Sequence, residues 1–223
     1  MARSTKEEAL ETRNRILDAA ENVFHENGVS RTSLADVAHA ANVTRGAIYW
    51  HFKNKSDLFD AMCERVRLPM EAMVEAGKDG NESDPLGQLR ATCIFVLREA
   101  VHNPHSRKVF DILFHKCEFV DPTDPISVRQ QECYLEGMAN IERILRNAIA
   151  REQLPQELDI RMAGVTLHAA VDGLLNHWLF APESFDLAGN AERLTDACLD
   201  TLRYAPSLRK QGAKSCKQGA GPA

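Results

Sequence analysis

Aromatic side chains are scarce in this chain. Only 6% of its 223 residues are Phe, Tyr or Trp, which gives no hint of a β-sandwich or a β-barrel. The hydrophobic fraction of 44% and the charged fraction of 26% are ordinary for a folded globular protein. The length is enough to bury a sizeable core, as one large domain or as a small domain joined to a larger one.

Cysteine pairs at C-x-x-C spacing are also missing. The cysteines are scattered, at Cys63, Cys93, Cys117, Cys133, Cys198 and Cys216. The chain has no leading apolar run that resembles a signal peptide. Polar residues interrupt the longest apolar segment, Val165 to Phe180, before it reaches the roughly 18 residues of a membrane span. We therefore expect reduced thiols, a cytoplasmic location and no integral membrane role.

The common signatures of enzymes are absent as well. The sequence contains no phosphate-cradling glycine loop, no G-x-S-x-G and no H-E-x-x-H. Four potential metal ligands, His102, His105, His115 and Cys117, lack the spacing of a structural zinc motif, and Cys117 with Glu118 makes a poor nucleophile site. We expect no catalytic residue, no metal and no cofactor, although a helical enzyme and a protein-interaction module remain rival classes.

Positive charge is in deficit overall but is concentrated in one short segment. The net charge is −5 and the isoelectric point is near 5.9, so a nucleic acid must be met by a local basic face. The segment Thr44 to Lys55, TRGAIYWHFKNK, combines aromatic and basic side chains with no acidic residue. An acidic protein needs a reason to leave such a segment uncompensated.

The residues before this segment predict two short helices joined by a tight turn. A first helix with apolar residues at helical spacing ends at Gly28. Ser33 and Asp36 have the spacing of a capping box at the start of a second helix. Thr44 is suited to cap a third helix that runs to about His51. This arrangement is typical of a helix-turn-helix.

The third helix has the size and polarity of a helix that enters DNA. Ile48 and Phe52 are four residues apart, so they share a face that packs on the first two helices, and the other side chains point outward. The major groove of B-form DNA admits one such helix. The expected DNA-binding residues are Thr32, Ser33, Thr44, Arg45, Gly46, Ala47, Tyr49, Trp50, His51, Lys53 and Lys55. The alternatives are a solvated charged surface for the cations and a core position for the aromatics, but three consecutive aromatic residues cannot all face inward from a helix.

Helical segments follow one another in the rest of the chain, and nothing reads as a strand. Ser56 is expected to cap a helix over 56–76, which the polar break from Gly77 to Pro85 ends. Further helices are expected at 85–101, 104–117, 124–151, 159–180 and 185–204. The predicted fold is all-α with about nine helices. It comprises a DNA-binding domain (1–55), a C-terminal domain (56–208) linked through helix 56–76, and a mobile tail (209–223).

The stretch from Thr12 to Phe59 closely resembles the DNA-binding domain of the TetR family of bacterial repressors, with the match running through GVSRTSLADVAHAANVTRGAIYWHFKNKSDLF. The likeness is strongest to the AcrR/TtgR-like regulators of multidrug efflux, and it extends to DILFHKCEF, LPQELD and AAVDGLLNHWLF in the second domain. The resemblance implies a homodimeric repressor that binds a palindromic double-stranded DNA operator and is released by a small hydrophobic, aromatic or cationic inducer. A regulator of a metabolic or catabolic operon is the alternative within the family.

The segment MAGVTLHAAVDGLLNHWLF is apolar nearly all round, which implies burial on two sides. As in the family, one side and a stripe on the last helix are expected to form a four-helix dimer interface. The interface residues are Leu167, Ala170, Gly173, Leu174, His177, Leu194, Cys198 and Leu202. The alternative is that both stripes belong to the core of one protomer.

The other side carries Asp172 on an apolar surface, where an ionised carboxylate needs a partner. Asp172 either bonds a neighbour such as His168 in a structural role, or the two are the few polar groups of a ligand cavity. The expected cavity residues are Cys93, Val96, Phe110, Phe114, Tyr134, Met138, Ile141, His168, Val171, Asp172 and Leu175. Each apolar member taken alone is equally suited to an ordinary core.

Overall fold

The structure is a computed structural model that describes residues 6–75, 83–118 and 121–210. The α-helices are α1 (Lys6–Asn27), α2 (Leu34–Ala40), α3 (Arg45–His51), α4 (Lys55–Glu75), α5 (Pro85–His102), α6 (Pro104–Asp111), α7 (Pro125–Ala150), α8 (Ile160–Phe180) and α9 (Leu187–Tyr204). A π-helix, η1 (Ile112–Lys116), and two 3-10 turns, η2 (Pro182–Ser184) and η3 (Pro206–Leu208), complete them. The described part of the chain is therefore all-α, as predicted, with one isolated β-bridge between Leu158 and Arg209.

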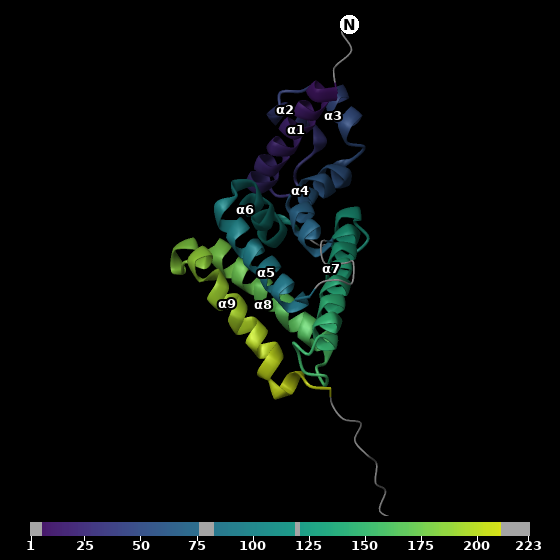
Figure 1. Ribbon diagram of the computed structural model, residues 1–223. Coiled ribbons are helices and arrows are strands. Elements are labelled where there is room, and N and C mark those ends of the chain that lie inside the picture. The colour runs from purple at the N-terminus through teal and green to yellow at the C-terminus, as the bar shows by residue number, and fades with distance from the viewer. Residues whose placement is uncertain (1–5, 76–82, 119–120, 211–223) are drawn as a thin grey trace, which may run out of the picture.

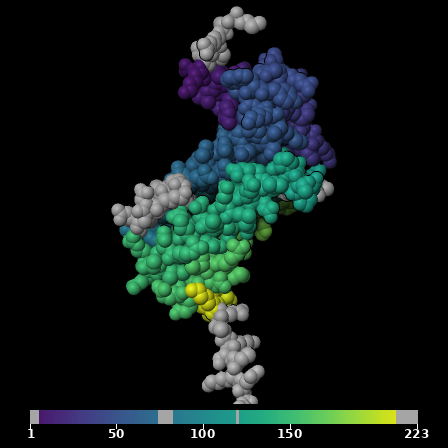
Figure 2. All heavy atoms as spheres, turned by 90° about the vertical axis from the view of Figure 1, so that its right-hand side faces the viewer, coloured from purple at the N-terminus to yellow at the C-terminus, as the bar shows by residue number. Residues whose placement is uncertain are grey.

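The helices form an elongated molecule with α1, α2 and α3 at one end (Figure 1). Helix α4 leaves this end and packs against α1 on one side and against α5, α6 and α7 on the other. The side view gives the same division, with the N-terminal helices above the larger C-terminal part (Figure 2). In none of the described helices are length and apolar character sufficient for crossing a membrane.

The turn between α2 and α3 is built from local signals in the sequence. Ser33 and Asp36 form the predicted capping box, with each side chain bonded to the backbone N–H of the other. Helix α2 ends at Ala40. Two residues later Asn42 adopts φ of 52°, and the Val43 N–H donates to the Ala38 carbonyl across the turn. This is a Schellman-type ending, in which asparagine tolerates the left-handed conformation better than most residues. The chain then enters α3 at the predicted cap, Thr44.

Helix α4 begins at Lys55, one residue earlier than predicted, and a different residue caps it. The Asn54 side chain accepts a hydrogen bond from the Asp57 N–H at 2.8 Å, and the Asp57 carboxylate accepts one from the Lys53 N–H at 2.9 Å. Ser56 lies inside the helix, so its expected role as the cap was wrong. Asparagine is as good a cap as serine, and the pair Asn54 and Asp57 satisfies two backbone donors at once.

The C-terminal helices agree closely with the predicted segments, with one difference. The helix predicted over 104–117 is α-helical only to Asp111 and continues as the π-helix η1 to Lys116. The hydrogen bonds of a π-helix join residues five apart, and such short segments are frequently found at functional sites. The hydrophobic periodicity of the sequence carries no signal for this change of pitch.

One apolar core joins the two parts of the molecule. It runs from Phe24 of α1 through Met62 of α4 to Leu97 of α5 and Trp178 of α8, and all four side chains are buried. A second core lies among α5, α7, α8 and α9. Since the larger core is shared, α1, α2 and α3 pack on the C-terminal helices through one apolar interior.

The chain remains packed slightly beyond the predicted end of the C-terminal domain. The Arg209 guanidinium donates to the carbonyls of Leu202 and Arg203, and the Lys210 N–H donates to the Glu157 carbonyl. Residues 209 and 210 therefore do not belong to a mobile tail as expected, and 211–223 lie outside the described residues. The five described cysteines are free thiols, and Cys216 is outside the described part.

Candidate functional site

Helix α3 presents its polar and aromatic residues to solvent. Ile48 is fully buried and Phe52 is 1% exposed, so the apolar side faces the protein as predicted. Trp50 is 72% exposed and Tyr49 is 48% exposed, and Arg45 is also at the surface. Large apolar rings are seldom left in water without a purpose when they cluster. This face therefore has the character of a binding surface.

The side chains of this face contact one another in the absence of a partner. The Thr44 hydroxyl accepts a hydrogen bond from the Ala47 N–H at 3.1 Å and fixes the start of the helix. The Arg45 guanidinium carbon lies 5.8 Å from the centre of the Tyr49 ring, within range of a cation–π contact. The Trp50 and His51 rings meet edge to face with centroids 4.5 Å apart. Gly46 leaves the backbone open between them, and a Cβ at that position would meet only the Thr44 hydroxyl, at 3.9 Å.

Arg13 of α1 belongs to this face, although the sequence pattern did not reveal it. Its guanidinium carbon lies 5.2 Å from the centre of the Phe52 ring. Partial burial lowers the pKa of His51, and the positive charge of Arg13 lowers it further. His51 is consequently neutral near pH 7 and can accept as well as donate a hydrogen bond. No local signal could mark Arg13, because only the packing of α1 on α3 brings it there.

Two of the expected DNA-binding residues have a structural role instead. Thr32 is buried, and its hydroxyl donates to the Gly28 carbonyl at 2.8 Å. The Lys55 ammonium donates to the carbonyls of Val29 at 2.7 Å and Ser30 at 3.1 Å, so it ties α4 to the loop after α1. Ser33 is exposed, and its hydroxyl donates to the Asp36 carboxylate. Lys53, which lies two residues after the end of α3, is also exposed. Hydrogen-bonding groups that could bind phosphate also serve to close loops, and the sequence does not distinguish the two uses.

His168 and Asp172 of α8 form the pair considered in the sequence. His168 Nδ1 lies 3.1 Å from the Asp172 carboxylate, and the ring of Tyr134 on α7 meets the His168 ring edge to face, with centroids 5.3 Å apart. The hydrogen bond to Asp172 raises the pKa of His168, against the opposing effect of burial. The three side chains make a polar cluster where α7 crosses α8.

The other expected ligand residues lie around this cluster, but they fill space. Cys93, Phe110, Met138 and Leu175 are buried in the apolar interior. Partly buried positions are held by Val96, Phe114, Ile141 and Val171, which pack against the cores. Two hollows described below have other linings.

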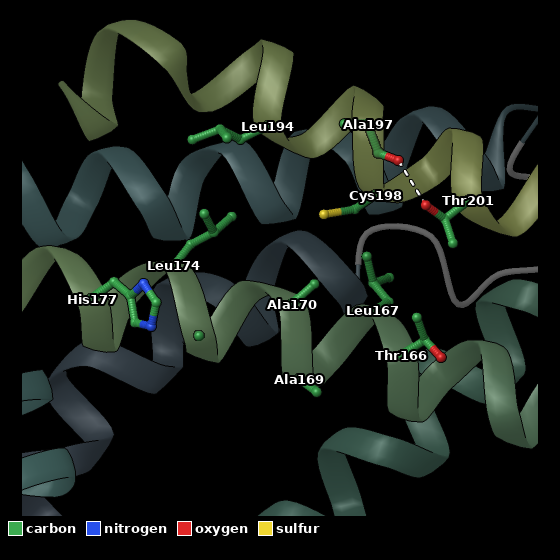
Figure 3. Close-up of a pocket in the computed structure, with 11 residues that line it drawn as sticks. Thr166, Leu167, Ala169, Ala170, Leu174, His177, Leu194, Ala197, Cys198 and Thr201 are labelled. Atoms are coloured by element: carbon green, nitrogen blue, oxygen red, sulfur yellow. Dashed lines mark hydrogen bonds between the residues drawn. The ribbon is translucent and has the colours of Figure 1, made fainter. Parts of the chain in front are cut away.

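The groove between α8 and α9 coincides with the expected dimer interface. It has a volume of about 430 Å³, and Leu174, Ala170 and Leu167 of α8 point toward α9 across it (Figure 3). Its lining includes the interface residues Leu167, Ala170, Gly173, Leu174, His177, Leu194 and Cys198. Leu202 does not reach the groove, because it is fully buried inside the protomer.

A second hollow, of about 410 Å³, lies over α5 and is lined partly by charged residues, among them Arg90, Arg98 and Glu192. Arg90 and Arg98 each form ion pairs with acidic residues of α9. This hollow is a gap between ion-paired surface side chains and contains none of the expected functional residues.

The potential metal ligands of the sequence separate in space. His105 Nδ1 lies 2.5 Å from the Glu21 carboxylate, whereas His115 contacts Asp111. Glu21 and His105 also lie near Asp18, but the Arg65 guanidinium sits 2.7 Å from Asp18 and 2.8 Å from Glu21. One guanidinium thus contacts both carboxylates, as in an ordinary ion-pair network.

Comparison with known proteins identifies the family. Residues 16–62 match bacterial regulatory proteins of the tetR family, and residues 84–204 match the C-terminal region of the MAATS-type transcriptional repressors. The chain belongs to the TetR family. The first match contains α2 and α3 complete, and the second begins just before α5 and ends with α9.

This TetR-family protein is similar to regulators over nearly its whole length. It is 45% identical to the HTH-type transcriptional regulator TtgR of Pseudomonas putida over 210 residues, which cover 94% of this chain and 100% of that protein. Its fold matches NalD, the secondary repressor of the MexAB-OprM multidrug efflux pump in Pseudomonas aeruginosa, with a TM-score of 0.75 and 36% identity over 87% of this chain and 98% of that one.

The match to a ligand complex is of similar quality. SmeT, the repressor of the Stenotrophomonas maltophilia multidrug efflux pump SmeDEF, has been solved with triclosan. That complex matches this TetR-family protein with a TM-score of 0.78 and 34% identity, over 91% of this chain and 96% of that chain. These relatives share both domains with the protein.

The His168–Asp172 pair yields a test of the polar cluster. Protonated His168 stabilises the fold below its ordinary pKa near 6.5, and this contribution is lost as the pH rises through the raised pKa. Asp172→Asn should lower the His168 pKa and reduce the free energy of unfolding by about 0.3–1 kcal/mol at about pH 5.5 but not at about pH 8.5. An NMR titration and urea unfolding measure the two effects.

Asp200→Asn is the matched control, because Asp200 pairs with Arg203 on exposed α9 and contacts no histidine. It should leave the His168 titration unchanged. A His168 titration that is the same in the Asp172 variant as in the wild type would contradict the assigned pairing.

Proposed function

We propose that this TetR-family protein is a ligand-responsive transcriptional repressor of a multidrug efflux operon. It acts in the cytoplasm, binds a palindromic operator as a homodimer and is released by small hydrophobic or aromatic compounds; it is not an enzyme. The observation that carries the proposal is the exposure of Arg45, Tyr49 and Trp50 on a capped helix whose apolar side is buried. The names of NalD and SmeT, both repressors of multidrug efflux pumps, support the choice of operon.

In this proposal α3 is the recognition helix. Its seven residues span about 10 Å, which fits the roughly 12 Å width of the major groove. Arg45 donates to guanine or to phosphate, and Gly46 and Ala47 allow close approach. Tyr49, Trp50 and neutral His51 contact the backbone or thymine methyl groups, and Lys53 contacts phosphate. Arg13, beside Phe52, joins this set.

The recognition helix can be tested by removing Arg45 or Tyr49. Arg45→Ala and Tyr49→Ala should each lower operator affinity by about 1–3 kcal/mol, about 5- to 150-fold, because each removes a direct contact with DNA. Fluorescence anisotropy on a palindromic duplex from the DNA beside the gene measures this, and sedimentation checks that dimerisation is intact. Arg161→Ala, which removes an exposed arginine at the start of α8, should bind like the wild type. Wild-type affinity in either α3 variant would reject the assignment.

The homodimer of this proposal is formed by α8 and α9 of two copies. The groove of Figure 3 is lined on the α8 side by Leu174 and Ala170, and Gly173 of the same helix also lines it. A two-fold axis through this groove would let α8 and α9 of each copy fill the hollow of the other as a four-helix bundle. Small residues such as Ala170 and Gly173 permit the close approach that such packing requires.

Gly173 offers a clean test of the dimer, because a Cβ added there meets nothing within 4 Å in the protomer. Gly173→Arg should leave the protomer folded, raise its helix propensity and convert the dimer into a 24.9 kDa monomer. Sedimentation equilibrium measures the mass. Gly137→Arg on α7 is the matched control, since a Cβ there is equally free, and it should remain dimeric. A dimeric Gly173→Arg protein would place the interface elsewhere.

The ligand site lies between α6, α7 and α8 around His168 and Asp172. Phe110 and Phe114 supply aromatic walls, and Val171 packs against both apolar cores, so a ligand inserted here would press on each of them. The few polar groups in apolar surroundings suit an aromatic or cationic compound. The described conformation is packed at this place, which fits a ligand-free state in which side chains occupy the space.

Phe114 tests the ligand site through triclosan, the compound bound to SmeT. Phe114→Ala should raise the triclosan concentration that releases half of the operator by about tenfold, because an aromatic ring contributes about 1.5–3 kcal/mol when buried. Ligand-free operator affinity should stay unchanged. Phe95→Ala is the control, since Phe95 is also partly buried but lines the other hollow. An unchanged triclosan response in Phe114→Ala would remove this residue from the site.

Release of the operator requires that the two parts of the chain, 1–55 and 56–208, move relative to each other. Helix α4 links them and contacts both. The half-sites of a palindrome lie about 34 Å apart and tolerate little mismatch in the spacing of two recognition helices. A coupling free energy of roughly 1–3 kcal/mol between the sites is enough for a 5- to 150-fold loss of affinity.

A further inference from the structure

A chain of ion-paired and hydrogen-bonded side chains crosses the molecule from α1 to α8. His25 Nε2 of α1 lies 3.0 Å from the Asp111 carboxylate of α6. The other oxygen of Asp111 lies 2.7 Å from His115 Nδ1 in η1, and His115 Nε2 lies 2.8 Å from the Asn176 side-chain oxygen on α8. Three links therefore connect the DNA-binding end to the helix that carries the proposed ligand site.

The two inner members of the chain are shielded, and their chemistry makes the links directional. The side chain of Asp111 is 19% exposed and that of His115 is 28% exposed. The Asp111 carboxylate only accepts, so both histidines donate to it. The Asn176 amide can turn its oxygen or its nitrogen toward His115, so this link can form whether or not His115 Nε2 carries a proton.

The α8 end of the chain is continuous with the ligand cluster. Asn176 follows Asp172 by one helical turn, and Asp172 follows His168 by one turn. Residues four apart lie on the same face of a helix. The three polar side chains thus form one stripe on α8. It begins at His168, beside Tyr134 of α7, and ends at Asn176, which contacts His115.

The other end is attached to the part of α1 that carries the DNA-binding helices. His25 lies in the last turn of α1, shortly before the loop that leads to α2. Next to it, the Val29 N–H donates to the Lys116 carbonyl at 3.0 Å, so the loop itself is bonded to η1. A displacement of η1 would be transmitted to α1 and to the start of the α2 loop together.

In the segment between the two ends, residues of the expected ligand walls alternate with residues of the hydrogen-bonded chain. Phe110 and Phe114 belong to the expected ligand walls, whereas Asp111 and His115, each the next residue, belong to the hydrogen-bonded chain. The change from α-helix to π-helix falls between Asp111 and Ile112. A single helical turn therefore faces the ligand site on one side and the DNA-binding helices on the other.

We propose that His25, Asp111, His115 and Asn176 form a relay that couples occupancy of the α7–α8 ligand site to the position of α1. This inference rests on the proposed function. A ligand that displaces Phe114 or α8 moves His115 relative to Asn176. Since a hydrogen bond weakens steeply beyond about 3.2 Å, a shift of about 1 Å breaks the chain at that link and frees α1 to rotate with α2 and α3. The four residues are positioning residues and contact neither DNA nor ligand.

A neighbouring contact provides the control. The Lys108 ammonium of α6 donates to the Asn22 side chain of α1 at 2.5 Å, so Lys108→Ala also removes an α1–α6 hydrogen bond. This contact lies on the same seam but has no described link to α8. A variant that weakens the seam in general and a variant that cuts the relay can therefore be distinguished.

The first experiment compares wild type, His25→Ala, Asn176→Ala, the double variant and Lys108→Ala. Operator affinity is measured by anisotropy with and without saturating triclosan, and triclosan affinity by calorimetry. Ligand-free operator affinity and triclosan affinity should stay within about threefold of wild type, but the ratio of operator affinities without and with triclosan should fall about fivefold or more in the relay variants. The double variant should lose no more than the worse single variant, because both cut one chain. Lys108→Ala should keep the wild-type ratio.

The second experiment needs no ligand. Long-range ¹H–¹⁵N correlation spectra of the imidazole rings report the hydrogen bonding of each ring nitrogen. Asn176→Ala should shift the ring nitrogens of His115 and, through Asp111, those of His25, whereas Lys108→Ala should leave His115 unshifted. A shift at His115 without one at His25 would show that the chain is interrupted, and it would overturn the relay.

The two proposals fail separately. A wild-type protein that does not release its operator with triclosan would contradict the proposed inducer class, and the imidazole spectra alone would then decide the relay. Normal release by triclosan together with full coupling in His25→Ala and Asn176→Ala would overturn the relay and leave the proposed function intact.

Discussion

The functional surface depends on burying one side of a helix that could not exist alone. Seven residues are far too few for a stable isolated helix, so α3 exists because Ile48 and Phe52 are buried in the apolar core that α1 and α2 share. Thr44 fixes its start and the Asn42 turn fixes its direction. Once these constraints are met, Tyr49 and Trp50 have no place but the surface. The same packing that stabilises the helix therefore exposes the residues that would read DNA.

The junction between the two parts combines an apolar core with a polar seam. The shared core through Phe24, Met62 and Leu97 keeps the parts together, while the contacts between α1 and α6 include hydrogen bonds and ion pairs. Glu21, buried at 1% exposure and held by Arg65 and His105, is the most shielded of these. A close-packed core does not deform continuously, and directional bonds have preferred positions. A junction of this kind favours a few discrete arrangements, which is what a two-state regulator requires.

Helix α8 is the element on which the separate roles converge. One of its sides lines the groove with α9, and another contacts α7 through His168 and reaches η1 through Asn176. A helix that is apolar nearly all round is expected to be covered on more than one side. In the proposed dimer, a ligand that moves α8 would therefore affect the partner copy and the DNA-binding helices at once.

The sequence alone determined most of the helices, the caps of α2 and α3 and the orientation of α3, because these depend on residues within a few positions of one another. Ser33 with Asp36, Thr44, and the spacing of Ile48 and Phe52 are such local signals, and the family resemblance extended them to both domains. Tertiary structure decided what depends on distant residues: Thr32 and Lys55 close loops, Arg13 joins the recognition face, and His25 meets Asp111. The sequence pattern also did not predict the π-helix η1 or the burial of Leu202. A hydroxyl or an ammonium group has many possible partners, and which of them it binds is settled only when the helices pack.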